Sequence, residues 1–287
     1  PNSGYVFDSW SGACTGSGAC QVTMDGNKSV TANFSTITIP ISFTGEELLG
    51  RPTDNSISIK IVPDAAITYY YEYGLTSGVY SHQTGTSSAS AGTPSTVVID
   101  SLTADSEYFY RMQYSTDGGN TWIARPELSF DTQKAVGSSF TFDVTTDSHV
   151  NIVLGDSSTW EDTLNDVLED EPDFLIDLGD TFDIRSLSEG DVSGAENSYK
   201  FQLPLFNTVS GSTSIFLSPG NHEQQEKWHE DVGANSLNVI GVNAQKKYFL
   251  NPVPDGVFYT GDESQDQYLN EYNDPADAIT GGLKQDY

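Results

Sequence analysis

The chain has 287 residues, 36% of them hydrophobic and 11% aromatic, so it can form apolar cores and is not of disordered composition. Its 12 Lys and Arg residues against 41 Asp and Glu residues give a formal net charge of −29. A field of this sign repels phosphate backbones and anionic lipids, so we expect neither a nucleic-acid-binding surface nor attachment to an anionic membrane. No apolar run is long enough to span a bilayer, so no membrane span is expected.

Residues 1–35 contain short alternating stretches broken by an Asp-Gly-Asn turn, which predicts a small module of β-strands. Cys14 and Cys20 are its two cysteines, and they are the chain's only ones. We expect them to form a local disulfide rather than a metal pair, because no further Cys and no nearby His completes four ligands. A disulfide implies an oxidising compartment, and hence a secreted or cell-surface protein.

The Trp10-x-Gly12 pattern, the paired cysteines and the stretch from Val22 to Phe34 resemble a divergent internalin B-type repeat, a β module of bacterial surface proteins. The resemblance implies a spacer or an adhesive role, with contact to a cell surface or a glycan. Because the chain begins at Pro1 inside this partial repeat, we expect it to be a fragment of a longer protein.

Residues 41–133 show successive short strand patterns separated by clusters of Gly, Ser, Asn and Asp, which predicts a β-sandwich. Leu102 and Tyr108 resemble the tyrosine corner of fibronectin type III-like domains, which implies that the tyrosine hydroxyl caps a nearby backbone group. Tyr69, Tyr70 and Tyr71 could form a sugar-binding surface, but alternation between the core and the surface of one strand is the simpler interpretation.

From residue 138 onward strands and helices alternate, which predicts an α/β sheet covered by helices. Ser158 and Glu161 have capping-box spacing, and the apolar residues that follow share one helical face as far as Pro172. A second helix is expected within residues 196–210, bent or interrupted at Pro204. The predicted strands are residues 140–144, 174–178 and 214–217. Residues 229–287 are less regular, and we interpret them as a loop insertion beside the site.

Each predicted strand is followed by polar residues, and the carboxyl ends of strands in an open α/β sheet meet at one edge. Asp147 and His149 follow the first strand, Asp180 follows the second, and Asn221 and His222 follow the third. Carboxylate, imidazole and amide groups suit divalent metals. We expect Asp180 to bridge two cations that would otherwise repel each other.

The motifs Asp-x-His, Gly-Asp-x-x-Asp and Gly-Asn-His-Glu, in this order, resemble the calcineurin-like metallophosphoesterase family. The resemblance implies hydrolysis of a phosphate mono- or diester with two divalent or Fe-type metal ions, such as Mn, Fe or Zn. Asp147, His149 and Asp180 would bind one ion, and Asp180 and Asn221 the other. His222 would be the general acid that protonates the leaving group, and Asp183 would orient it.

Three departures from the family pattern limit this interpretation. The family's later His and its Gly-His-x-His are missing, since only His229 follows the third motif, so we expect residues 1–287 alone to be at most weakly active. Asp183 stands where purple acid phosphatases have a Tyr ligand, which argues against an iron–tyrosinate centre. Arg185 does not fall in the family's Asp-Arg-Gly order, so no Arg contact to phosphate is expected. The acidic stretch Asp262–Asp266 could bind calcium but lacks EF-hand spacing.

The expected fold class is therefore multidomain, β followed by α/β. Its parts are a partial internalin B-type repeat (1–35), a fibronectin type III-like sandwich (41–133) and an incomplete metallophosphoesterase domain (138–287). Taken singly, the Asp and His residues could be helix caps or loop residues, but three ordered clusters favour a metal site. The alternative function is a non-catalytic adhesion or glycan-binding protein with a degenerate phosphoesterase-like domain.

Overall fold

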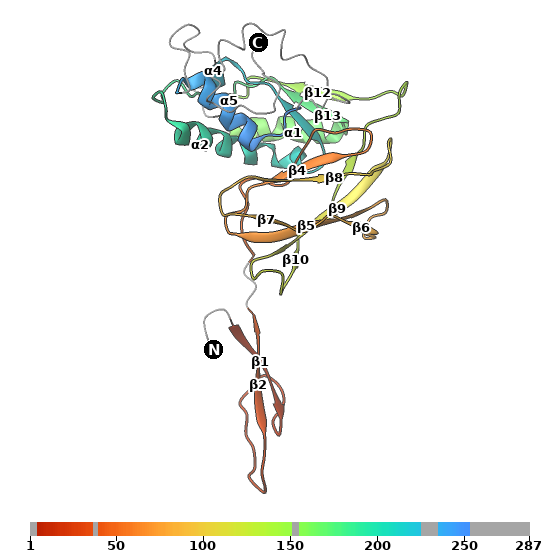
Figure 1. The fold of residues 1–287 in the computed structure, drawn as a ribbon, viewed down its shortest axis with the longest axis vertical. Coiled ribbons are helices and arrows are strands. Elements are labelled where there is room, and N and C mark those ends of the chain that lie inside the picture. The colour runs from red at the N-terminus through yellow and green to blue at the C-terminus, as the bar shows by residue number, and fades with distance from the viewer. Residues whose placement is uncertain (1–4, 37–39, 151–154, 225–234, 253–287) are drawn as a thin grey trace. The chain divides into compact units, whose positions relative to one another are not determined.

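The computed structural model describes residues 5–36, 40–150, 155–224 and 235–252. The chain divides into two compact units, residues 1–41 and 42–287. Figure 1 shows the strands and helices of each unit. Within the described ranges, no helix is long and apolar enough to cross a membrane.

The first unit is an antiparallel hairpin, in which the ring of Phe7 packs against Trp10 and Phe34 with centroids 4.9 and 5.8 Å away. Cys14 and Cys20 form a disulfide with their Cα atoms 5.8 Å apart, which confirms the expected pairing. So small a core needs such a covalent link. The strands are β1 (Tyr5–Gly12) and β2 (Val30–Thr36).

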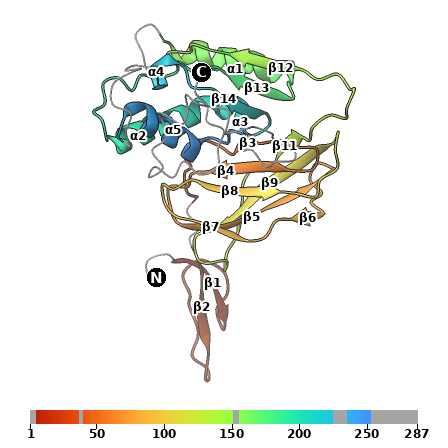
Figure 2. The same cartoon turned by 45° about the horizontal axis from the view of Figure 1, so that its top comes forward.

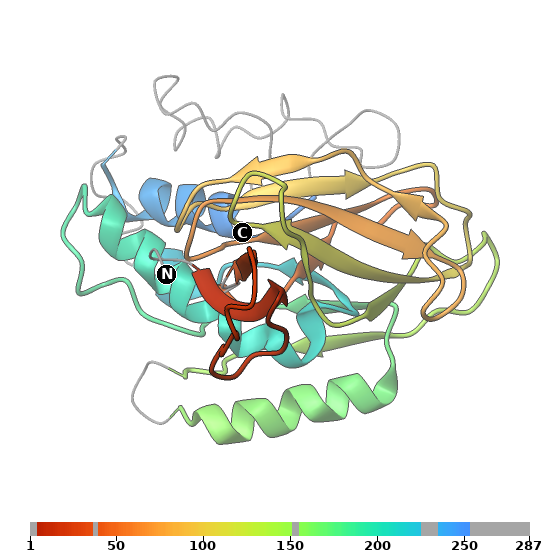
Figure 3. The same ribbon diagram turned by 90° about the horizontal axis from the view of Figure 1, so that it is seen from below.

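The second unit begins with the expected β-sandwich, built from two antiparallel sheets. One sheet has the order β3-β4-β8, and the other has the order β10-β9-β5-β6, with β7 paired to β5 and β11 paired to β9. Figure 3 shows these strands in orange to yellow-green. They are β3 (Leu48–Gly50), β4 (Ile57–Ile61), β5 (Ile67–Gly74), β6 (His82–Gln83), β7 (Ser87–Ala89), β8 (Ser95–Ile99), β9 (Glu107–Ser115), β10 (Ile123–Ala124) and β11 (Leu128–Asp131).

The tyrosines of the sandwich follow the period of a half-buried strand. Tyr69 and Tyr71 are fully buried while Tyr70 between them is partly exposed, which confirms the alternation. The hydroxyl of Tyr108 accepts a hydrogen bond of 3.0 Å from the backbone N–H of Thr103, which confirms the expected capping of a backbone group. Both features tie the sandwich core to its loops.

Strand β4 is buried on both of its faces. Its three isoleucines share one face, and Lys60 projects from the other, where its Nζ donates to the carbonyls of residues 246, 247 and 249 at 3.3, 2.9 and 2.8 Å. Burial and the neighbouring charge of Arg51 lower the pKa of Lys60 to about 7. The lysine thus joins the sandwich to the C-terminal end of a helix in the following α/β part.

We expect Lys60→Met to destabilise the second unit by about 2–4 kcal/mol. Methionine fills the same space but leaves three carbonyls without this donor, and buried acceptors are costly to leave unsatisfied. Urea unfolding of the chain followed by circular dichroism measures the change. Lys134→Met is the matched control, because Lys134 makes only surface ion pairs and should cost less than about 1 kcal/mol. Equal losses of stability in the two variants would show that Lys60 does not join the sandwich to the α/β part.

The α/β part is built on a parallel three-stranded sheet with the order β12-β13-β14 (Figure 2). In its register Val144 lies opposite Ile176, which lies opposite Phe216. This confirms the predicted strand–helix–strand alternation. The strands are β12 (Phe142–Thr145), β13 (Phe174–Asp177) and β14 (Ser214–Leu217).

The helices begin and end partly as predicted. The predicted capping box at Ser158 is wrong, since the N-cap is Asp156, whose carboxylate accepts from the N–H groups of Ser158 and Thr159 at 2.9 and 3.0 Å. The expected interruption at Pro204 is confirmed by a 3₁₀ turn between two helices. The helices are α1 (Ser157–Asp170), α2 (Val192–Gln202), the 3₁₀ turn η1 (Leu203–Phe206), α3 (Asn207–Ser210), α4 (Asn221–Gln224) and α5 (Leu237–Tyr248).

The prediction of an irregular insertion after residue 229 is wrong for helix α5. Ser236 caps this helix through the N–H of Val239, and Ile240, Ala244 and Tyr248 are buried along one face of it. This spacing of small and large apolar residues is helical, but the Asn and Gly residues among them weaken the pattern in the sequence. Helix α5 packs beside α2, as Figure 2 shows.

The two faces of the parallel sheet differ. Leu175, Ile215 and Leu217 face a core that also contains Trp160 of α1 and Tyr199 of α2. The opposite face is apolar but open among the described residues: Phe142 and Val144 are 45% and 52% exposed. Its aromatic rings stack on one another, with Phe142 and Phe174 centroids 5.4 Å apart. Helices α1, α2, α3 and α5 therefore contribute side chains to the same core on one side of this sheet.

Candidate active site

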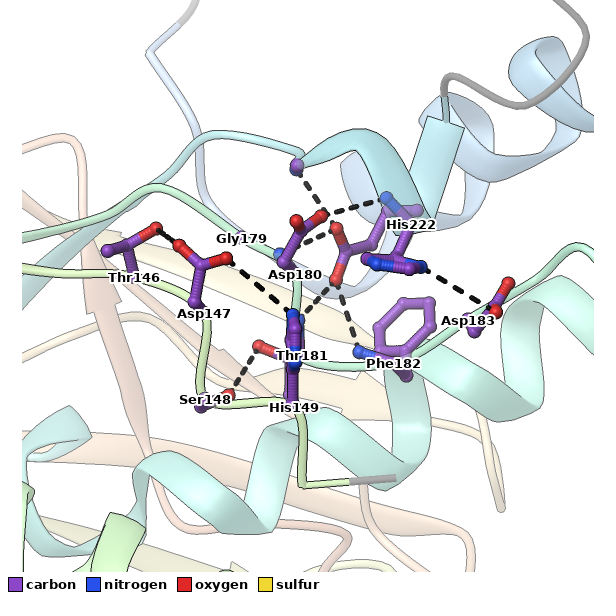
Figure 4. A network of polar contacts seen from close by, with 12 residues as sticks. Thr146, Asp147, Ser148, His149, Gly179, Asp180, Thr181, Phe182, Asp183 and His222 are labelled. Atoms are coloured by element: carbon purple, nitrogen blue, oxygen red, sulfur yellow. Dashed lines mark hydrogen bonds and ion pairs between the residues drawn. The ribbon is translucent and has the colours of Figure 1, made fainter. Parts of the chain in front are cut away.

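The predicted site residues lie on three loops that follow the three parallel strands. The backbone N–H of Asp147, after β12, donates to the carbonyl of Gly179 at 2.9 Å, and that of His149 donates to the carbonyl of Asp180 at 3.0 Å. The loop after β12 is thus held against the loop after β13. Figure 4 shows that their side chains point into one region together with His222 from α4.

His149, Asp180 and His222 form the centre of this region. Each offers one ligand atom, and these atoms lie within 4.8 Å of one another. Asp147 Oδ1 lies 3.6 Å from His149 Nε2, at the exposed side of the group. His149 Nε2 and His222 Nδ1 are buried, and neither has a hydrogen-bond partner in the described part of the chain. Buried nitrogens without partners beside carboxylates fit a divalent cation.

The backbone at these residues is in an uncommon conformation. Asp147, His149 and Asp180 have φ angles of 54°, 48° and 60°, in the left-handed region that non-glycine residues rarely adopt. Such conformations persist only where surrounding contacts determine them, and they concentrate at functional sites. Here they turn the three side chains towards one another.

Two glycines allow the loops after β13 and β14 to touch. Gly179 has a φ of 83°, and a Cβ atom on it would overlap the backbone nitrogen of Gly220. A Cβ atom on Gly220 would in turn overlap the carboxylate and the backbone nitrogen of Asp180. Any side chain at either position would therefore separate Asp180 from His222.

His222 and Asp183, the predicted acid and the residue predicted to orient it, lie close together. His222 Nδ1 lies 3.6 Å from Asp183 Oδ2, beyond hydrogen-bond length. Arg185 donates from its backbone N–H and its Nε to the Asp183 carboxylate at 2.8 and 2.6 Å. Although burial acts in the opposite direction, these hydrogen bonds and the Arg185 charge lower the pKa of Asp183. Asp183 is therefore an anion beside His222.

The catalytic and ligand roles of individual residues stay predictions. His222 lies among the ligand atoms as well as beside Asp183, so the geometry is compatible with either a ligand or an acid. Asn221 is the first residue of α4 and is exposed. His229 and the acidic stretch Asp262–Asp266 lie outside the described residues.

Two further carboxylates, both buried, support this site. Asp177, at the end of β13, has no exposed surface and accepts hydrogen bonds from Thr145 Oγ1 at 2.8 Å and from Gly179 N–H at 3.0 Å. Glu223 is 1% exposed, and burial raises its pKa. The sequence does offer a signal for Asp177, which is an acidic residue at the end of an apolar strand. A carboxylate buried there requires hydrogen-bond donors such as backbone N–H groups as partners.

Asp177 predicts a pH dependence of stability. Burial raises the pKa of Asp177 from its usual 3.8 to about 7. The folded chain therefore binds a proton that the unfolded chain has released, and stability falls as the pH rises from about 4 to about 7. Asp177→Asn removes this loss, so the variant should gain stability over the wild type by on the order of 2–4 kcal/mol across this range.

Urea unfolding at pH 5, 6 and 7.5, in the presence of a chelator, measures this difference. Asp162→Asn, at an exposed position of α1, is the control and should follow the wild-type profile. A constant difference between Asp177→Asn and the wild type at all three pH values would contradict the assignment.

Comparisons with known proteins decide the family. The family model for the calcineurin-like phosphoesterase matches residues 140–281. Residues 140–281 belong to the calcineurin-like phosphoesterase family. The model for the divergent InlB B-repeat domain matches residues 1–38, which confirms the resemblance of the N-terminal unit. No curated protein sequence matches the chain.

Solved structures support the fold of the phosphoesterase domain. The structure of PhoD is similar with a TM-score of 0.53 and 15% identity, over 76% of this chain and 48% of that one. Purple acid phosphatase PPD1 from yellow lupin (Lupinus luteus) seeds gives a TM-score of 0.52 and 16% identity, over 79% of this chain and 44% of that one. The chain thus spans about half the length of these structures. The predicted fold class, a β-rich N-terminal region followed by an α/β phosphoesterase fold, is confirmed.

Proposed function

We propose that the protein hydrolyses phosphate mono- or diesters with two metal ions. The observation that carries the proposal is the convergence of His149, Asp180 and His222 at the ends of three adjacent strands, in the phosphoesterase domain. PhoD and purple acid phosphatase, which share the fold, are similar in the same region. A net charge of −29 repels phosphate, so bound cations are also a precondition for holding this substrate.

The roles that we propose follow from position. Asp147, His149 and Asp180 hold one ion, and Asp180 with Asn221 holds the second; Mn, Fe and Zn all suit these ligands. When bound, such ions supply Lewis-acid stabilisation of the charge that develops on the phosphoryl oxygens. His222 protonates the leaving oxygen, and the Asp183 carboxylate, 3.6 Å from its Nδ1, orients the imidazole.

Metal dependence tests this function. The complete gene product is stripped with a chelator, reloaded with Mn²⁺, Zn²⁺ or Fe²⁺ one at a time, and assayed with p-nitrophenyl phosphate and bis-p-nitrophenyl phosphate. Turnover restored by at least one metal is expected, and the preferred substrate separates monoesterase from diesterase. Absence of metal-dependent turnover with every combination would overturn the proposal.

The second candidate is a non-catalytic adhesion or glycan-binding protein, favoured by the divergent InlB B-repeat at residues 1–38. Glycan binding by the complete gene product without any turnover would support it. The cluster of His149, Asp180 and His222 argues against a degenerate domain, because a domain without a metal site has no reason to keep two buried imidazole nitrogens without hydrogen-bond partners among the described residues.

We further propose that the protein works outside the cytoplasm, secreted or at a bacterial cell surface. The Cys14–Cys20 disulfide of the N-terminal unit supports this location, because such bonds persist in oxidising compartments.

A further inference from the structure

The side chain of Glu223 binds four backbone N–H groups. Its Oε2 accepts from Asp180 and Gly220 at 2.8 and 2.9 Å, and its Oε1 accepts from Thr181 and Phe182 at 2.7 and 3.3 Å. Three of these donors belong to the loop after β13, and one belongs to the loop after β14. One buried carboxylate therefore fastens two loops that are about forty residues apart in sequence (Figure 4).

The loop after β13 needs such an acceptor. The left-handed conformations of Gly179 and Asp180 turn successive N–H groups inwards, away from the strand ladder. Buried N–H groups that lack a partner cost on the order of 1–3 kcal/mol each. Only a carboxylate offers two oxygens with enough acceptor capacity for four donors.

The fastened loops contain the residues of the cation cluster. Asp180 Oδ1 accepts from the backbone N–H of His222 at 2.8 Å, and the Asp180 carbonyl accepts from the N–H of His149 at 3.0 Å. Moving residues 180–182 away from residue 220 would therefore separate the Asp180 carboxylate, and His149 with it, from His222. Glu223 itself points into the loops rather than into the cluster.

We propose that Glu223 is a positioning residue that sets metal affinity by holding the Asp180 loop against the His222 loop. This inference rests on the proposed metal-dependent function and deepens it. Partners behind metal ligands typically change metal affinity by 10–100-fold when they are altered. Glu223→Gln replaces one acceptor oxygen with a donor, which faces two backbone N–H groups and should open the pair of loops.

The test compares Glu223→Gln and Glu223→Asp with the wild type in the complete gene product. Calorimetric titration of the metal-free protein with Mn²⁺ should give about 10–100-fold weaker binding for Glu223→Gln. The conservative Glu223→Asp, which keeps both oxygens and the charge, should recover part of the affinity. Hydrogen exchange of the metal-free Glu223→Gln protein should be faster at the amides of residues 180–182 and 220.

Gln245→Leu is the matched control. Gln245 is also 1% exposed, and its Nε2 donates to the backbone carbonyl of Leu217 at 2.8 Å, so it binds the end of β14 rather than the four amides that Glu223 holds. We expect this variant to lose stability while it keeps wild-type Mn²⁺ affinity. If Glu223→Gln fails to fold, hydrogen exchange of the wild-type protein tests the proposal instead. The proposal then requires the amides of residues 180–182 and 220 to be as protected as those of β13.

Unchanged Mn²⁺ affinity and unchanged exchange in Glu223→Gln would overturn the proposal, as would rapid exchange of the four amides in the metal-free wild type. If the wild type binds none of Mn²⁺, Zn²⁺ and Fe²⁺, the proposed function fails instead, and the exchange measurements still decide whether Glu223 fastens the loops.

Discussion

Asp180→Asn is expected to lower kcat/KM for phosphate-ester hydrolysis by roughly 10³-fold or more, the equivalent of the several kcal/mol that metal ions contribute to such reactions. Asp180 lies with His149 and His222 in the cluster of ligand atoms. Asparagine keeps the shape and can still accept the hydrogen bond from the His222 N–H, so the fold should persist. What the variant loses is the negative charge that we expect to bridge two cations.

Steady-state kinetics at saturating Mn²⁺ measure the loss of activity, and Mn²⁺ titration measures the effect of the lost charge on metal binding. Asp156→Asn is the control, because it removes the same charge from the N-cap of α1, where asparagine caps as well as aspartate. Activity of Asp180→Asn within a few-fold of the wild type would show that Asp180 is not a ligand, and the proposed metal centre would have to be abandoned.

His222→Asn is expected to slow the hydrolysis of alkyl phosphates by roughly 10²–10⁴-fold, the usual contribution of a general acid. An alkoxide leaving group needs a proton, whereas p-nitrophenolate leaves readily without one. Hydrolysis of p-nitrophenyl phosphate should therefore fall much less. Asp183→Asn should follow the same pattern with a smaller effect, because Asp183 lies 3.6 Å from the imidazole and acts only through it.

Comparison of the two substrates at several Mn²⁺ concentrations separates the two possible roles of His222. An acid affects the alkyl substrate and leaves Mn²⁺ affinity unchanged. A ligand affects both substrates equally and weakens Mn²⁺ binding. Equal effects on both substrates with weaker Mn²⁺ binding would contradict the assignment of His222 as the acid, but not the phosphoesterase function.

The strand ends could be predicted from the sequence because local patterns determine them. Apolar runs such as Phe174–Leu178 mark strands that line a core, and polar residues directly after them must lie at the carboxyl edge of the sheet. Asp147, Asp180 and His222 could therefore be brought together without a structure. The left-handed conformations at Asp147, His149 and Asp180 gave no such signal, because aspartate and histidine also occur in ordinary loops.

Contacts between a buried side chain and the backbone of a distant segment could not be predicted. The alternating pattern of its strand predicts that Lys60 is exposed. In the structure it is buried against the end of α5, 186 residues further along the chain. In the sequence Glu223 is only the last residue of a motif. Its four backbone partners are brought to it by the contact between two loops. In both cases the partner is a backbone group, which every residue has and no sequence pattern reveals.

The aromatic face of the β12-β13-β14 sheet, which is open among the described residues, has a consequence for behaviour in solution. Phe140, Phe142 and Val144 are 59%, 45% and 52% exposed on a chain whose net charge is −29. At low ionic strength, mutual repulsion keeps copies apart; added salt shortens the range of that repulsion, and sulfate also strengthens apolar contacts. High salt, or a pH near the isoelectric point of about 4.1, should therefore promote self-association through this sheet. Dilute, mildly alkaline buffers of low ionic strength suit the purification of the protein.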